Sequence, residues 1–272
     1  MTYEFSYKAI QLTELTTVHA LKLPPNHRCY SWGAAADPQE QSSQAFFMRV
    51  MFDRLAPAWM GPITLRATQR CSLLQSASSA PVDLYIDDGK HRLANLVLTA
   101  RATHELVQEA LTEQVRCSMS ERDVMRLERL TATPHLSAIA GINVECRLSG
   151  DQSASSVHHL VNSVHAAALE AKAGLAATTA ALWSTRLQYG VDSDEYKSLL
   201  EAQRAWEVML GNAEANLVYN TYLQLRSRLM GSCWSDFIHT AEEVVERLQV
   251  INFALILCQP VKRPGFRGGH LV

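Results

Sequence analysis

The stretch Tyr85-Ile86-Asp87-Asp88-Gly89-Lys90-His91-Arg92-Leu93 decides how the rest of the chain is interpreted. Its first residues are typical of the end of a short strand, and the Asp-Asp-Gly sequence that follows is typical of a tight turn. Behind the turn, apolar residues recur at helical spacing from Leu93 to Val107. The sequence therefore predicts a strand, a glycine turn and a helix in direct succession.

The predicted turn has the chemistry of an anion site. Amide groups at the start of a helix are unpaired and carry partial positive charge, so they receive phosphate groups readily. Lys90, His91 and Arg92 add cationic or hydrogen-bonding side chains on the same first turn. Positive charge at a helix start opposes the helix dipole, and a bound anion would offset that cost. The alternative is an ordinary Asp-Gly turn followed by solvated basic side chains, and it stays open here.

A second segment, upstream, carries an arginine between aromatic residues. Pro24-Pro25 excludes a helix, so the residues behind them are extended or in a turn. In an extended segment Arg28, Tyr30 and Trp32 share one face, because side chains alternate. An arginine with two rings is a set that stacks on a base and contacts a phosphate. The alternative is that Tyr30 and Trp32 are half-buried packing residues.

Composition narrows the function classes. The 272 residues are 47% hydrophobic, and the net charge of −2 provides no global attraction to nucleic acid or acidic membranes. Six cysteines without a C-x-x-C pair argue against a zinc knuckle and for reduced thiols. No signal-peptide core opens the chain, and the apolar run near Val250 to Cys258 is too short to span a bilayer. We expect a cytoplasmic protein without membrane contact.

The three histidines of an Ala-rich stretch, His158, His159 and His165, invite a metal interpretation. No carboxylate stands at a ligand spacing such as H-E-x-x-H, and His158 and His165 lie two helical turns apart. We therefore predict no metal site among them and interpret them as solvated or core residues.

Periodicity and turn residues predict an α+β fold. The elements expected from the first part of the chain are a helix at Ile10–Val18, an extended piece at Ala20–Leu23, a helix at Ser43–Leu55, strands at Trp59–Leu65 and Val82–Ile86 separated by a loop at Arg66–Pro81, and the helix after Gly89. The later elements are helices at Met119–Leu130, Ser153–Trp183, Asp192–Leu210, Ala213–Leu229 and Ser235–Leu248, with strands at Asn143–Leu148 and Ile251–Cys258. We divide the chain into a small α+β domain at 1–115, a helical region packed on it at 116–258, and a basic tail at 259–272.

Three motifs occur in the order and approximate spacing of a known family. They are Leu23-Pro24 through Arg28-x-Tyr30-x-Trp32, then Met60-Gly61-x-Ile63-x-Leu65, then Ile86-Asp87-Asp88-Gly89-x-x-Arg92-Leu93-x-x-Leu96. In this the chain resembles the N-terminal domain of GmrSD-type restriction proteins, which has a ParB/sulfiredoxin-like fold. The family signatures are I-P-x-Y-Q-R-x-Y-x-W, F-L-G-x-I and D-G-Q-Q-R-L-T-T-L. The similarity covers roughly Leu21 to Ala110 and continues more weakly to about Cys258.

The resemblance implies nucleotide binding and hydrolysis at the turn, in proteins that defend bacteria against foreign DNA. Carried over by position, it implies catalytic roles for Asp88, His91 and Arg92, and nucleotide-binding roles for Gly89, Lys90, Arg92, Arg28, Tyr30 and Trp32. The cofactor would be a nucleoside triphosphate, with GTP, UTP and ATP not distinguished, and Mg²⁺ is a candidate second cofactor. Asp88 would hold a divalent ion or orient water. His91 would transfer protons, since the pKa of histidine lies near neutrality.

The chain departs from the family at the residues that would activate water. Lys90 and His91 replace both glutamines of the family motif, and Ala94-Asn95 replaces its Thr-Thr. A glutamine offers a donor and an acceptor, whereas lysine offers donors only. Phosphate binding is compatible with this set, but hydrolysis is placed in doubt.

Three hypotheses follow. The chain is an NTP-hydrolysing subunit of a restriction system, a non-catalytic module that senses a nucleotide or DNA, or an inactive remnant. Many family members carry an HNH nuclease domain, and no such arrangement is visible in this sequence. We therefore expect no nuclease activity from the chain alone, and a separate HNH-type nuclease subunit as a partner.

Overall fold

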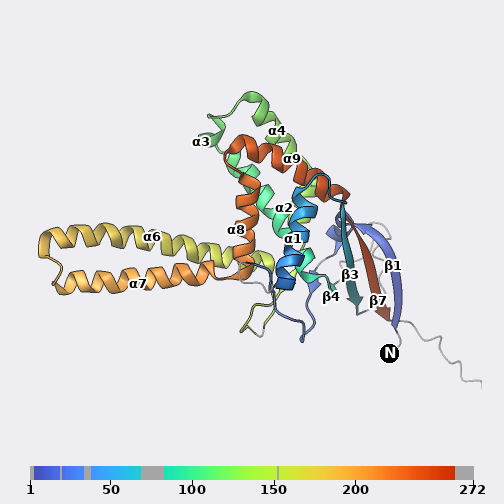
Figure 1. Cartoon of the computed structure of the whole chain (residues 1–272), viewed down its shortest axis with the longest axis horizontal. Coiled ribbons are helices and arrows are strands. Elements are labelled where there is room, and N and C mark those ends of the chain that lie inside the picture. The colour runs from blue at the N-terminus through green and yellow to red at the C-terminus, as the bar shows by residue number, and fades with distance from the viewer. Residues whose placement is uncertain (1–2, 19, 34–37, 69–82, 152, 261–272) are drawn as a thin grey trace, which may run out of the picture.

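The computed structural model describes residues 3–18, 20–33, 38–68, 83–151 and 153–260. A five-stranded sheet lies on one side of a helical body, and a long helical hairpin projects from the other side (Figure 1). The strands of the sheet are β1 (Tyr3–Gln11), β2 (Ala20–Lys22), β3 (Trp59–Ala67), β4 (Asp83–Asp88) and β7 (Asn252–Pro260), in the order β1-β7-β3-β4-β2. A 3₁₀ helix, η1 (Leu12–Thr17), connects β1 to β2.

The sheet joins both ends of the described chain. Strand β7 lies antiparallel to β1 and parallel to β3, whereas β4 is antiparallel to β3 and parallel to β2. One face of the sheet is apolar and covered by helices, as the burial of Ile63, Leu65, Phe253 and Leu255 indicates. The sheet therefore takes strands from both 1–115 and 116–258.

The helical body is organised around α2. Its helices are α1 (Pro38–Phe52), α2 (Lys90–Ala110), α3 (Glu113–Arg116), α4 (Glu121–Thr131), α5 (Pro134–Ala140), α8 (Leu217–Met230) and α9 (Trp234–Val250). A short strand pair, β5 (Glu145–Cys146) and β6 (Ser155–Ser156), lies beside them. Residues 93 to 100 of α2 are all buried, because α4, α5, α8 and α9 pack around this helix.

The projecting hairpin consists of α6 (Val157–Tyr189) and α7 (Asp194–Glu214), which lie side by side (Figure 1). The first turns of α6 belong to the body, since Val157, Leu160 and Val161 are buried. A helix of 33 residues is about 50 Å long, so most of α6 extends beyond the body. We call residues 165–210 the arm.

The predicted class, an α+β fold with a mostly helical later part, is confirmed. The strand-turn-helix unit is also as predicted, with β4 ending at Asp88 and α2 beginning at Lys90. Helix α4 begins after Ser120, whose hydroxyl accepts the amide of Asp123 as an N-cap. None of the helices that the structure describes combines the length and apolar character needed to cross a bilayer.

Some predicted elements were wrong. The helix expected at Ile10–Val18 is the end of strand β1 followed by η1, because β1 is held by its pairing with the distant β7. Helix α1 begins at Pro38 instead of Ser43, since proline suits the first helical turn. The N-cap of α7 is Ser193 instead of Asp192, and α7 continues past Gly211 to Glu214. Most of the loop predicted at Arg66–Pro81 and of the tail at 259–272 lies outside the described residues.

Candidate functional site

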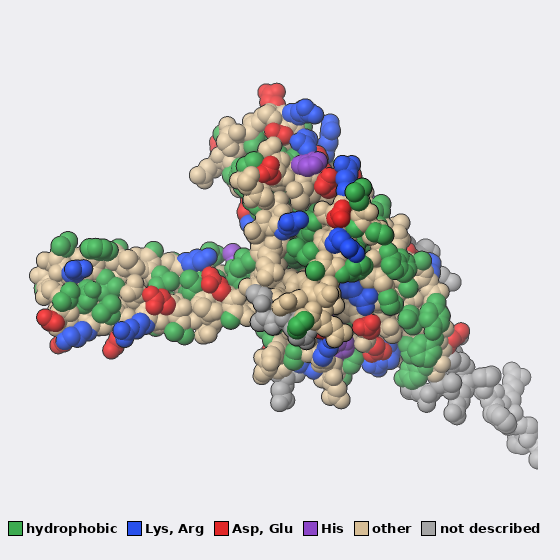
Figure 2. Space-filling view, in the orientation of Figure 1, with side chains coloured by type: hydrophobic (Ala, Val, Ile, Leu, Met, Phe, Trp, Pro, Cys, Tyr) green, Lys and Arg blue, Asp and Glu red, His purple; other side chains and the backbone are tan. Residues whose placement is uncertain are grey.

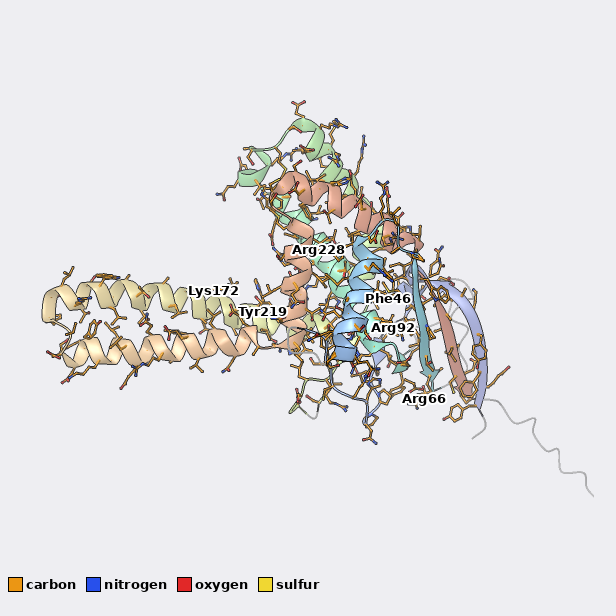
Figure 3. All side chains as sticks on the ribbon, in the orientation of Figure 1. Phe46, Arg66, Arg92, Lys172, Tyr219 and Arg228 are labelled. Carbon is orange, nitrogen blue, oxygen red and sulfur yellow. The ribbon has the colours of Figure 1, made fainter. Side chains whose placement is uncertain are left out.

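The turn at Gly89 opens onto a cavity of about 690 Å³, a volume within the usual range of ligand sites. Its wall comes from the segment before α1, from α1, from β3 and from the start of α2. The lining residues are Arg28, Trp32, Gln39, Glu40, Ser42, Ser43, Phe46, Phe47, Trp59, Met60, Gly61, Asp88, Gly89, Lys90, His91 and Arg92. Figure 3 labels Phe46 of α1 and Arg92 of α2, which both line this cavity.

Gly89 makes the turn possible. Its φ of +92° is favourable only for glycine, and a Cβ there would lie 2.8 Å from Cγ1 of Ile63. The first helical hydrogen bond runs from the amide of Leu93 to the carbonyl of Gly89, at 3.0 Å. The amides of the three residues between them precede the helical ladder, and Gly89 has no side chain to cap them. The start of α2 is therefore an open donor group on the cavity wall.

Arg92 is held in place on that wall. Its Nη1 donates to the carbonyl of Met60 at 2.9 Å, and its Nη2 donates to Oδ2 of Asp88 at 3.2 Å. Gly61 permits this approach, since a Cβ there would lie 2.9 Å from Nη1. Burial lowers the pKa of Arg92 from its usual value and the Asp88 carboxylate raises it, and a guanidinium keeps its charge. Asp88 itself is 59% exposed, so its second oxygen faces solvent.

Glu40 ties the two sides of the cavity together. Its Oε1 accepts from Nη1 of Arg28 at 2.9 Å, and its Oε2 accepts from Nε1 of Trp32 at 2.7 Å. The carboxylate is 12% exposed, whereas the Arg28 side chain is 63% exposed. The exposed guanidinium thus stands at the cavity with one nitrogen engaged, and Glu40 fixes its position.

Lys90 points into the interior. Its side chain is buried, and Nζ donates to the carbonyl of Arg28. Burial lowers the pKa of Lys90 to about 8, so the ammonium form still prevails at neutral pH. Its positive charge acts beneath the cavity instead of projecting across it.

His91 is a neutral hydrogen-bond acceptor. Its Nε2 accepts the amide of Ser31 at 3.0 Å, which places the ring proton on Nδ1. The ring stacks on Trp32 with centroids 5.5 Å apart. Burial, followed by the charges of Lys90 and Arg28, lowers the pKa of His91 to about 3. The proton-transfer role predicted for His91 assumed a pKa near neutrality, and this geometry does not support that role.

The aromatic residues of the upstream motif are packing residues, which was the alternative for this segment. Tyr30 does not line the cavity, because its ring is buried and its hydroxyl bonds to Asn95 at 2.8 Å and Thr221 at 3.3 Å. Trp32 is 3% exposed, with His91 against its ring. The stacking role predicted for Tyr30 and Trp32 is therefore not supported.

Three residues of the site were missed from sequence. Phe46 and Trp59 are the rings that the cavity exposes, at 43% and 44%. Glu40 lies before the helix predicted at Ser43–Leu55, because α1 begins earlier than its apolar residues indicate. An acidic residue two positions after Pro38 is the signal of a helix start that was available in the sequence.

The site combines an open helix start, the exposed guanidinium of Arg28, the partly buried guanidinium of Arg92 and two exposed rings around one hollow. It suits a ligand with an anionic end and a flat end. Among the described residues, no three His, Cys, Asp or Glu side chains gather as a metal site. The exposed Asp88 oxygen is the group that would contact a divalent ion carried in by phosphates.

Comparison with models of protein families and with curated proteins finds no match to this chain. The resemblance to GmrSD-type restriction proteins therefore rests on the three motifs alone.

Proposed function

We propose that this cavity binds a nucleoside phosphate, and that the chain is the nucleotide-binding component of a bacterial defence system against foreign DNA. The observation that carries the proposal is the open start of α2 on the same wall as Arg92 and Arg28. The resemblance of the Asp-Gly-x-x-Arg turn to the family motif adds support for nucleotide binding. The proposed role in defence rests on this resemblance.

The cavity chemistry fits each part of a nucleotide. Phosphates suit the amides of residues 90–92, with the Arg92 and Arg28 guanidinium groups beside them. A base suits the exposed faces of Phe46 and Trp59, since aromatic stacking accepts any base. When bound, Mg²⁺ would neutralise part of the phosphate charge, with Asp88 as its protein ligand.

The geometry of the site favours nucleotide binding without hydrolysis. His91 has its acceptor nitrogen engaged by Ser31, and burial keeps the ring neutral. Lys90 is directed to the Arg28 carbonyl, and its donors do not supply the acceptor of the glutamine that it replaces. We therefore favour a nucleotide sensor that docks a separate HNH-type nuclease over an NTP hydrolase.

Thermal unfolding with ATP, GTP and UTP, each with and without Mg²⁺, tests the proposal. A nucleotide at about one hundred times its Kd adds roughly 2.7 kcal/mol, a shift of several degrees in Tm for a chain of this size. Arg92→Ala should lose most of that shift. Arg116→Ala also removes an arginine paired with a carboxylate. This variant should keep the Tm shift, because Arg116 lies on α3, which does not line the cavity.

Two outcomes would contradict the proposal: no shift with any of the three nucleotides, or equal loss in both variants. Trp59→Ala should weaken the binding of nucleotides more than the binding of inorganic triphosphate, because the substitution removes a ring and no charge. Release of inorganic phosphate by the wild-type chain at a rate that Arg92→Ala abolishes would establish hydrolysis in place of sensing.

A further inference from the structure

The arm carries a continuous row of apolar side chains on the side of α6 that faces away from α7. The row repeats at alternating spacings of three and four residues, from Ala166 through Leu169, Ala173, Ala176, Ala180 and Trp183 to Leu187. All seven are exposed, and the three large ones are exposed by 54% (Leu169), 62% (Trp183) and 85% (Leu187). We call this row the outer seam. Figure 2 shows hydrophobic side chains gathered on the outer part of the arm.

The same helix already uses this spacing on its other side. Ala168, Ala171, Leu175, Thr178 and Leu182 form an inner row that is buried or half-buried against α7. Within that contact Gly174 admits the Trp206 ring so closely that a Cβ would lie 2.4 Å from it. Alternating spacings of three and four residues are the pattern of a helix that packs along its length on another helix. Helix α6 is thus built to pack on two sides, and α7 covers one of them.

We propose that the outer seam packs against the outer seam of a second copy of this chain, in an antiparallel arrangement. The sizes along the seam are complementary to themselves about a two-fold axis at Ala176. In that alignment Trp183 lies opposite Leu169 of the second copy, and Leu187 lies opposite Ala166. Ala180 lies opposite Ala173, so the two backbones approach most closely at the axis. Each contact occurs twice, as an isologous interface requires.

The charges beside the seam agree with this alignment. The seam itself carries no charged residue. The charged residues beside it on α6 are Glu170, Lys172 and Arg186. An axis at residue 176 sets them level with Leu182, Ala180 and Ala166 of the second copy, so none meets a like charge. A parallel alignment would have the same alanine levels but would set Trp183 against Trp183 and Leu169 against Leu169. The antiparallel alignment is therefore the better packed of the two.

The length of the seam sets the strength of the interface. Twenty-one steps from residue 166 to residue 187 span about 32 Å of helix, which is a small footprint beside a standard interface of about 800 Å² per partner. We therefore expect a weak dimer, and its test needs protein concentrations that extend well above the micromolar level.

Sedimentation of the full chain from about 5 to about 200 µM tests the dimer. We expect the mass to rise from 30.3 kDa toward twice that value. Ala176→Glu puts a carboxylate on the axis and should weaken the dimer at least about tenfold. Ser198→Glu adds the same charge at an exposed position of α7 and should leave it unchanged. A wild-type monomer throughout, or a dimer indifferent to Ala176→Glu, overturns the proposal.

Disulfide trapping tests the orientation. The background replaces the exposed Cys117 and Cys233, together with Cys71, by serine. In this background, two Ala176→Cys chains should form a disulfide-linked dimer. Two Leu169→Cys chains should not. A mixture of Leu169→Cys with Trp183→Cys should form the mixed dimer. A disulfide between two Leu169→Cys chains would overturn the antiparallel arrangement. Binding of the seam to a helix of a different protein, in place of a second copy, would overturn the proposed homodimer.

Discussion

Helices α2 and α6 illustrate two ways in which a long helix is placed in one protein. On α2, residues 93 to 100 are all buried, whereas on α6 residues 186 to 189 are all exposed. The difference is not one of helix propensity, since both sequences are rich in alanine and leucine. The first half of α2 has neighbours on all sides, whereas the outer part of α6 has α7 on one side (Figure 1).

Because residues 93 to 100 are buried, α2 pairs most of its core polar groups within the helix itself. The hydroxyl of Thr99 donates to the carbonyl of Asn95 at 2.7 Å, and the hydroxyl of Thr103 donates to the carbonyl of Thr99 at 2.8 Å. Asn95 itself donates to the carbonyl of His91 at 2.7 Å. This ladder pairs the threonine hydroxyls and the amide nitrogen of Asn95 in the core, whereas Oδ1 of Asn95 has no hydrogen-bond partner among the described residues. The comparison predicts that substitutions on α2 have large effects and that matched substitutions on the arm have small ones.

The largest expected difference is between alanine substitutions of one leucine on α2 and one leucine on α6. Leu96→Ala should lower the free energy of unfolding by about 3 to 4 kcal/mol, because it leaves a cavity in a fully buried site. Leu187→Ala, at a side chain that is 85% exposed, should change it by less than about 0.5 kcal/mol. Urea unfolding of both variants measures the contrast, and comparable losses would show that the arm is held as firmly as the body.

A smaller contrast separates two glycines with positive φ. Gly89→Ala should lower the free energy of unfolding by roughly 2 to 3 kcal/mol, since it adds a clash with Ile63 at 2.8 Å to a strained φ of +92°. Gly190→Ala, between the two helices of the arm, has a φ of +82° and open space, and should cost about 1 kcal/mol. The same urea experiment applies. Equal costs would mean that the turn before α2 relaxes around the new methyl group.

The smallest effect is a pH dependence confined to the body. The pKa of His91 is lowered to about 3, so the unfolded chain takes up a proton below the ordinary value of 6.5 while the folded chain does not. Folding stability should therefore fall as pH drops from 6.5 toward 3. His91→Gln keeps an acceptor for the Ser31 amide. Between pH 7 and pH 5, its free energy of unfolding should fall by on the order of 1 to 2 kcal/mol less than that of the wild type.

His159→Gln, at an exposed position of α6, is the matched control for this experiment. Unfolding free energies measured at several pH values give the slopes. Identical slopes for wild type and His91→Gln would contradict the buried, neutral state of the ring.

Local signals predicted the elements that local chemistry determines. The Asp-Asp-Gly turn and the periodic run behind it located the end of β4 and the start of α2, because a glycine at positive φ and a helical stripe are both visible over a few residues. The strand beginning at Trp59 and the helix expected at Ser235–Leu248 were also close to β3 and α9.

Features set by distant contacts were not predictable in the same way. Strand β1 exists because it pairs with β7, about 250 residues away, and nothing in its own sequence states that partner. The sequence placed Tyr30 and Trp32 on one face but could not say that Asn95, Thr221 and Glu40 would bury them. The exposed rings of the cavity come from α1 and β3, and their meeting depends on the packing of the whole body.

The place of β7 inside the sheet has a consequence for biosynthesis. A ribosome adds about 5 to 20 residues per second, so β1 waits on the order of ten seconds or more for its neighbour to be made. During that time β1 and β3 have no strand between them, whereas the hairpin of α6 and α7 closes from nearby segments. A nascent chain of this protein should therefore keep β1 and β3 without their shared neighbour until residues 252–260 have been made.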